Sequence, residues 1–226
     1  LLVFAIKGAL VPLQFWLPGT YSAAPGPVAA LFAVMTKVGA YAVIRCGTLI
    51  FGATATAGLW SGLLWPAALA TMVLGALGVL AARGLARMVA FAAIGSMGVV
   101  FVAVAAGTPE ATAAALYYLL HSTLAVAVLF LLADLIASQR GDRLAPAAPL
   151  AGIVATLFMV AAVAVVGMPP LSGFIGKLLV MEALRNEAAA TWSFILAASF
   201  ITLLGLARAG SVLFWKTEGA ALPRPP

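Results

Sequence analysis

Four basic side chains lie inside long apolar segments: Lys7, Lys37, His121 and Lys177. Lysine and histidine can accept and release protons, so their presence there points to proton transfer. Lys37 and His121 each stand about ten residues into an apolar segment, which in a helix is a depth of about 15 Å. At the centre of a membrane each lysine costs roughly 2.5–3.5 kcal/mol, which packing alone does not explain.

Other interpretations of these residues stay open at this stage. Lys7 could lie near a helix end and extend its charged group to the membrane surface. His121 could be a hydrogen-bonded histidine of an ordinary core. Lys37 is too far from either end of its segment to reach water easily, and Lys177 stands beside a helix-breaking sequence. These two lysines are therefore the strongest candidates for a proton-carrying role.

Two prolines interrupt an apolar run in the stretch VVGMPPLSGFIGKLLV. Pro169 and Pro170 remove two backbone donors, so one helix should end before them and another should begin near Leu171–Ser172. Pro12 breaks the segment AIKGALVPLQFWLP in the same way. Within a membrane, freed backbone groups must line a hydrated cavity or be buried in protein. We therefore expect a polar site at the second break, with Lys177 as its titratable group.

The composition is that of an all-α polytopic membrane protein. Of the 226 residues 65% are hydrophobic and 8% are charged, whereas about 25% are charged in an ordinary soluble domain. The mean hydropathy is +1.19. We expect about seven transmembrane helices, some of them broken, over residues 1–17, 27–51, 62–82, 87–106, 111–137, 150–185 and 190–215. Turn-rich connections are expected at residues 18–27, 107–109 and 138–149.

Several classes of site are excluded by composition. The single cysteine, Cys46, excludes an internal disulfide and a cysteine metal site. The sequence has no metal-ligand spacing and no phosphate-binding glycine loop, so we predict neither a metal nor a cofactor. Lysine and arginine exceed the acidic residues by 12 − 6 = 6, but they are scattered in connections, which indicates membrane topology rather than nucleic-acid binding. The chain begins within an apolar run, as expected of a fragment of a longer protein.

The segment 150–185 is too long for one ordinary span and too short for two. Basic residues decide between these, because connections rich in lysine and arginine stay in the cytoplasm. A single broken crossing gives a split of seven to two, and two crossings give five to four. The seven on one side are Arg83, Arg87, Arg140, Arg143, Arg208, Lys216 and Arg224, and the other two are Arg45 and Arg185. We therefore predict one broken crossing and a cytoplasmic C-terminus.

Three stretches resemble a known family. AIKGALVPLQFWLPGTYSAAPGPVAALFAVMTKVGAYAVIR is similar to the signature of the antiporter-like subunits shared by Mrp-type cation/proton antiporters and the membrane arm of NADH–quinone oxidoreductase. ALYYLLHSTLAVAVLFLLADLI and GMPPLSGFIGKLL extend this resemblance over nearly the whole chain. TKVGAYAVIR and LADLIASQRGDRL look most like the D-type subunit of the multisubunit (Mrp/Pha) antiporters. Lys177 also favours an antiporter, since the M-type subunit of quinone reductase typically has glutamate there.

The resemblance implies a lateral proton pathway. Lys7 matches the lysine of the first broken helix, Lys37 the lysine of the next helix, His121 the histidine of the connecting helix and Lys177 the charged residue of the second broken helix. Many relatives place another lysine where this chain has Val126. Either water then relays protons between His121 and Lys177, or this half-channel is weaker.

The resemblance also implies about fourteen helices in two inverted repeats. Residues 1–53 would end the first repeat, 58–216 would form the second, and 217–226 would be a cytoplasmic tail. The glutamate that pairs with Lys7 would lie on a helix outside this sequence.

The implied function is that of a multi-pass subunit of a Na⁺/H⁺ or K⁺/H⁺ antiporter in the bacterial inner membrane. Its partners would be the other subunits of a hetero-oligomeric complex, the lipid bilayer, protons and Na⁺ or K⁺. This is a transporter subunit and not an enzyme. One alternative is a proton-pumping subunit of NADH–quinone oxidoreductase or a related hydrogenase. Another is an assembly scaffold that transports nothing.

Overall fold

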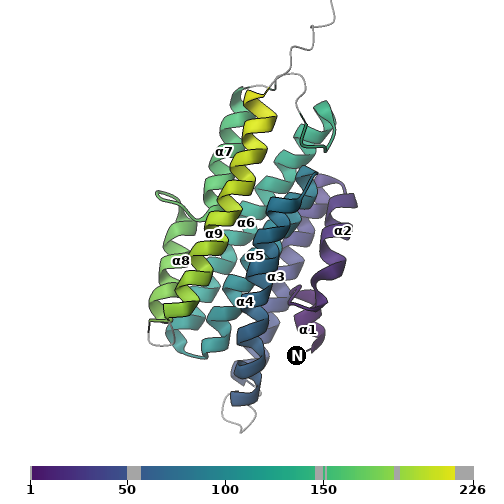
Figure 1. The fold of residues 1–226 in the computed structure, drawn as a ribbon. Helices are drawn as coiled ribbons and strands as arrows, with labels where there is room; N and C mark the ends of the chain where they lie inside the picture. Colours follow the sequence, from purple (N-terminus) through teal and green to yellow (C-terminus); the bar gives the residue numbers. More distant parts are fainter. Residues whose placement is uncertain (1, 50–56, 146–149, 151, 186–188, 217–226) are drawn as a thin grey trace, which may run out of the picture.

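The computed structural model describes the chain outside residues 1, 50–56, 146–149, 151, 186–188 and 217–226. The described part is a bundle of helices that run along one common direction (Figure 1). Its elements are α1 (Leu2–Lys7), the 3-10 helix η1 (Leu13–Phe15), α2 (Trp16–Ala23), α3 (Gly26–Leu49), α4 (Ala57–Ala81), α5 (Leu85–Ala106), α6 (Pro109–Arg140), α7 (Gly152–Val166), α8 (Ser172–Ala183), α9 (Ala189–Gly210) and the π-helix η2 (Ser211–Trp215). The predicted tail 217–226 lies outside the described residues, and the predicted repeat boundary falls partly outside them.

The bundle has seven crossings in the part that the structure describes. Five helices are long and apolar enough to span a membrane: α3, α4, α5, α6 and α9, the last with η2. Two more crossings are each built from two shorter helices placed end to end, α1 with α2 and α7 with α8 (Figure 1). These seven crossings confirm the predicted number of spans. All elements of the described residues are helical, which confirms the all-α class.

Both predicted helix breaks are present. The first break (residues 8–12) separates α1 from η1 and contains Pro12, and the second break (residues 167–171) separates α7 from α8 and contains Pro169 and Pro170. α8 begins at Ser172, as predicted. Each proline lacks the amide that a continuous helix would require, so the helical hydrogen bonding stops there.

The prediction of a turn over residues 18–27 is wrong for most of that stretch. α2 runs from Trp16 to Ala23, and the connection to α3 therefore consists of Ala24 and Pro25. The prediction placed the start of the turn at Pro18. It lies in the first turn of α2, where its missing amide has no helical partner to lose.

Helices α4 and α5 approach each other closely because glycines line their contact. A Cβ atom on Gly75 would lie 2.3 Å from the backbone nitrogen of Gly95, and a Cβ on Gly98 would lie 2.6 Å from the backbone nitrogen of Met72. α5 is the central helix of the bundle, with 83% of its apolar window buried. The side chains of α5 are therefore placed to contact the interior polar groups of several neighbouring helices.

Acidic side chains cap two helices at the same end of the bundle. Asp142 Oδ1 accepts a hydrogen bond of 2.8 Å from the amide of Ala86 in the first turn of α5. Asp134 Oδ1 accepts one of 3.1 Å from Gly26, the first residue of α3. A carboxylate at a helix N-terminus satisfies an unpaired amide and complements the helix dipole.

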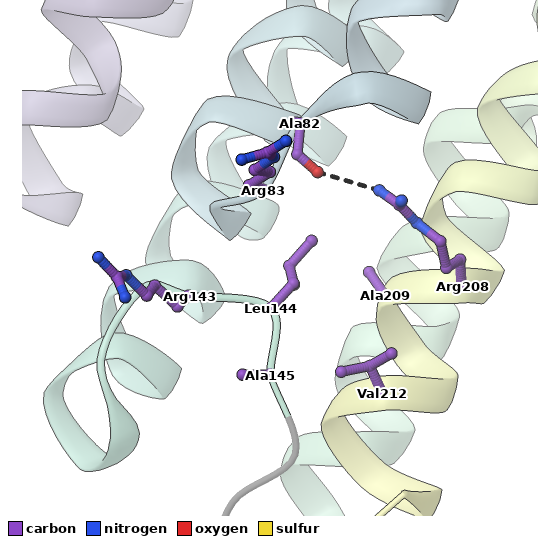
Figure 2. A pocket seen from close by; sticks show the side chains of 8 residues that line it. All are labelled: Ala82, Arg83, Arg143, Leu144, Ala145, Arg208, Ala209 and Val212. Carbon is purple, nitrogen blue, oxygen red and sulfur yellow. Dashed lines mark hydrogen bonds between the residues drawn. The ribbon is translucent and has the colours of Figure 1, made fainter.

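The basic connections gather at this end of the bundle. Figure 2 shows Arg83, Arg143 and Arg208 around one cavity of about 590 Å³, and Arg208 Nη2 donates a 3.0 Å hydrogen bond to the carbonyl oxygen of Ala82. The end of α9 thus lies beside the α4–α5 connection. Two crossings within 150–185 would have sent it to the opposite end, so the prediction of a single broken crossing is confirmed.

Candidate proton-transfer site

Lys37 lies in the middle of α3 and is buried, with 3% of its surface exposed. Its Nζ donates to Ser96 Oγ at 2.8 Å and approaches Met97 Sδ at 3.2 Å, both on α5. Ser96 Oγ donates in turn to the carbonyl oxygen of Ala93 at 2.7 Å. Lys37 is therefore held in the interior by a neutral hydroxyl and a thioether.

Lys177 lies on α8, in the second turn after the second break, and is 8% exposed. Its Nζ donates to the carbonyl oxygen of Val166 at 2.6 Å and to Ser199 Oγ at 2.6 Å. Val166 ends α7, so its carbonyl has no helical amide beyond it and is free to accept. The lysine thus satisfies a backbone group that the break itself has released.

His121 on α6 contacts both sides of the second break. Its Nε2 lies 2.9 Å from the carbonyl oxygen of Ala164 on α7, and its Nδ1 lies 2.8 Å from Ser172 Oγ on α8. A carbonyl only accepts, so Nε2 must carry the proton. The Nδ1 atom accepts from Ser172 when the ring is neutral and donates to it when the ring is charged. His121 can therefore change protonation without losing either partner.

Two glycines allow these groups to come together. Gly167 has a φ of +77°, a left-handed conformation that glycine adopts without steric cost. A Cβ atom on Gly173 would lie 2.2 Å from the carbonyl oxygen of Ala164 and 2.6 Å from His121 Nε2. The second break thus requires glycine both for its turn and for the close approach of α8 to α7.

Lys7 differs from the other candidates. It ends α1 and is exposed on the surface of the described chain, so its place in the predicted proton path stays a prediction. α1 turns its small residues inward instead, and a Cβ on Gly8 would lie only 2.5 Å from the ring of Phe101. Because this inward face is occupied by the bundle, Lys7 faces outward.

A small cavity of about 20 Å³ is lined by Lys177 and by Ser96, the hydrogen-bond partner of Lys37. The lining residues with polar side-chain groups are Ser96, Tyr118, Lys177, Ser199 and Thr202. Ser96 is the hydroxyl partner of Lys37, and Ser199 is that of Lys177. The cavity therefore adjoins the surroundings of both lysines.

Sequence patterns did not single out the three hydroxyls on α5 and α9. Ser96 stands in AAIGSMGVV and Ser199 and Thr202 stand in AASFITLL, each a polar residue within an apolar run. This was a usable signal, but serine and threonine commonly bond to their own helix. Val126, where many relatives were expected to carry a lysine, is fully buried and provides no polar group.

The fold and its interior define a polytopic membrane protein with two lysines buried inside its bundle. The chain belongs to the family described as NADH:quinone oxidoreductase/Mrp antiporter, transmembrane, which matches residues 1–205. This confirms the resemblance found in the sequence motifs.

The chain is similar to antiporter subunits from bacteria. It is 38% identical over 226 residues to the D subunit of the Na(+)/H(+) antiporter of Bacillus subtilis (strain 168), a match that covers 96% of this chain and 45% of that protein. It is 35% identical over 258 residues to the D subunit of the probable K(+)/H(+) antiporter of Rhizobium meliloti (strain 1021), covering 98% of this chain and 48% of the other. The chain thus spans about half the length of these relatives.

A solved structure has the same fold. The Mrp complex from Dietzia sp. DQ12-45-1b contains a chain that superposes with a TM-score of 0.87 at 29% identity. The match covers 94% of this chain and 40% of that one. The fold of this chain therefore corresponds to part of that longer chain.

Proposed function

We propose that the chain is part of a D-type membrane subunit of a multisubunit Na⁺/H⁺ or K⁺/H⁺ antiporter in a bacterial cell membrane. It acts there as a transporter subunit and not as an enzyme, and its partners are the other subunits of the complex. The observation that carries the proposal is the burial of Lys37 and Lys177 with neutral hydrogen-bond partners.

A structural lysine in an apolar interior is expected to pair with a carboxylate, because an unpaired buried charge is costly. Within the described residues the one ion pair joins Arg185 to Glu182, and both side chains are exposed. Lys37 and Lys177 bind hydroxyl, carbonyl and sulfur atoms instead. Such surroundings tolerate a neutral amine, so each lysine can release a proton and take one up again.

The proposed relay contains the four basic residues named from the sequence. Lys37 and Lys177 carry the proton through the interior. His121 acts beside Lys177 at the second break, where it contacts α7 and α8. Lys7, exposed at the end of α1, provides the point at which the path meets the surface of the described chain.

The experiment that tests this function replaces Lys37 by alanine in the full-length chain within its complex. We expect Lys37→Ala to abolish cation/proton exchange in vesicles while the complex still assembles. Lys216→Ala, which removes an exposed lysine at the basic end, is the control and should exchange at the normal rate. Unchanged exchange with Lys37→Ala would show that the subunit is a scaffold or carries protons by another path.

The proposal also fixes an orientation. Arg83, Arg143 and Arg208 lie at one end of the bundle (Figure 2), and we assign that end to the cytoplasm because basic connections are retained there. A reporter fused after Lys216 should be active on the cytoplasmic side. Activity only in the periplasm would reverse the assignment.

A further inference from the structure

The cavity at the basic end of the bundle has a lining that suits an anion. It measures about 590 Å³ and lies between the α4–α5 connection, the connection that follows α6 and the end of α9 (Figure 2). Each of these three segments contributes one arginine to the lining: Arg83, Arg143 and Arg208. Among the described residues, no acidic side chain lines the cavity and none of the three arginines forms an ion pair. Three positive charges therefore meet there with no carboxylate beside them in this part of the chain.

Backbone hydrogen bonds fix the segments that carry these arginines. The amide of Leu144 donates to the carbonyl oxygen of Arg83 at 3.0 Å, which holds the two connections side by side next to Arg143. Arg208 Nη2 donates to the carbonyl oxygen of Ala82 at 3.0 Å, and this uses one of the five N–H donors of its guanidinium. The side chains of the other two arginines make no hydrogen bond within the described residues. Most of the N–H donors around the cavity are therefore available to a ligand.

A neighbouring cavity of about 560 Å³ lacks this excess of positive charge. It is lined by Arg83 and Arg87, but Asp142 lines it too. The Asp142 carboxylate, which accepts a hydrogen bond from the amide of Ala86, offsets part of the charge of the two arginines. An anion should therefore bind more strongly in the first cavity than in this one.

The position of the first cavity favours an amphipathic anion. Its arginines alternate with apolar side chains, among them Leu144, Ala209 and Val212. Trp215 follows Val212 by three residues in η2 and is 66% exposed, and tryptophan is enriched where membrane and water meet. The cavity thus lies near the level of lipid headgroups. Its volume falls within the range of small-molecule sites, roughly 300–1,000 Å³.

We propose that this cavity binds the phosphate headgroup of an anionic phospholipid. Arginine suits phosphate because its planar guanidinium presents two parallel N–H groups to two oxygens. Basic pockets between transmembrane helices bind the headgroups of anionic lipids in this way. A zwitterionic headgroup contains the same phosphate but adds a positive amine, which three arginines repel. The site requires only that the chain spans a membrane, so it does not rest on the proposed transport function.

The test measures binding of phosphatidylglycerol to the full-length chain in its purified complex, with native mass spectrometry to count the bound lipids at each lipid concentration. The variant combines Arg83→Gln with Arg143→Gln, whose side chains make no hydrogen bond within the described residues. Each arginine near a membrane strengthens binding of an anionic lipid about fivefold. The dissociation constant of one lipid should therefore rise roughly 25-fold. Phosphatidylcholine should bind the unsubstituted complex more weakly than phosphatidylglycerol does.

Arg87→Gln is the matched control. Arg87 lies at the same end of the bundle and is exposed, but it lines only the neighbouring cavity. Its replacement removes the same charge and should leave the dissociation constant nearly unchanged. If the combined variant fails to assemble, Arg143→Gln alone provides the answer, with an expected rise of about fivefold.

Addition of inorganic phosphate at constant ionic strength separates a lipid site from a site for free anions. Phosphatidylglycerol that stays bound supports the lipid, and its displacement would overturn the proposal. Equal binding by the combined variant and by Arg87→Gln would overturn it as well. A combined variant that stays folded but loses one other subunit would assign the arginines to a protein partner instead. Because lipid binding is measured without transport, this result and the exchange measured with Lys37→Ala can fail separately.

Discussion

The two helix breaks solve the same backbone problem with different side chains. At the first break the amide of Val11 donates to Thr71 Oγ1 at 3.0 Å, and Trp16 Nε1 donates to the carbonyl of Ile6 at 3.1 Å. Neither the hydroxyl of threonine nor the indole of tryptophan gains or loses a proton at the pH values at which proteins are folded. The freed groups of the first break are therefore held by partners that are always neutral.

At the second break the side chains that bind backbone carbonyls are titratable. His121 Nε2 binds the carbonyl of Ala164, and Lys177 Nζ binds that of Val166. A proton gained or lost at either side chain changes how strongly it holds the broken backbone. Both breaks are therefore polar structures inside the bundle. Only the second break, whose hydrogen-bond donors are titratable, can respond to the gain or loss of a proton.

The largest effect on stability is expected at Gly173. In Gly173→Ala the new Cβ would lie 2.2 Å from the carbonyl of Ala164, so α7 and α8 must separate. We expect the complex to lose about 3 kcal/mol of stability, the upper range for overpacking. Thermal unfolding of the purified complex measures this. Gly152→Ala, with nothing within 4 Å of its Cβ, is the control and should unfold at the normal temperature.

A smaller loss is expected at the first break from Thr71→Val. Thr71 is fully buried, and valine would leave the amide of Val11 without its acceptor. An unsatisfied buried amide costs about 2 kcal/mol, so the unfolding temperature should fall. The exchange rate of the intact complex should remain normal. Loss of exchange in a stable Thr71→Val complex would mean that the first break, too, takes part in proton transfer.

The smallest loss is expected from Trp16→Phe. This change removes one partly exposed hydrogen bond, to the carbonyl of Ile6, and should cost about 1 kcal/mol with no change in exchange. His121→Phe is its counterpart at the second break and should lower exchange, since a titratable group is lost. If Trp16→Phe and His121→Phe exchanged cations for protons at the same rate, the two breaks would not differ in function.

Sequence patterns predicted the features that depend on composition and on proline. The seven crossings follow from the length of the apolar runs, the breaks follow from Pro12, Pro169 and Pro170, and the single crossing of 150–185 follows from the distribution of arginine. These properties are local, or they sum over the whole chain, so they can be predicted without knowing which helices touch.

Features that depend on contacts between distant helices could not be predicted. The contact of Lys37 with Ser96 joins residues 59 positions apart, and no local pattern indicates it. The exposure of Lys7 depends on which face of a six-residue helix packs inward. The role of Ser199 arises only because α9 lies beside the second break. In each case the residue type was visible in the sequence, and its partner was not.

The central claim, that the second break is built around a group that must change protonation, is tested most directly by Lys177→Arg. Arginine keeps a permanent positive charge because its guanidinium hardly deprotonates, and it retains donors for the carbonyl of Val166. The measurement is cation/proton exchange in vesicles that contain the full complex, with Lys177→Ala alongside. We predict that Lys177→Arg blocks exchange nearly as fully as Lys177→Ala. Exchange at the normal rate would show that Lys177 is a fixed charge, and it would contradict the account.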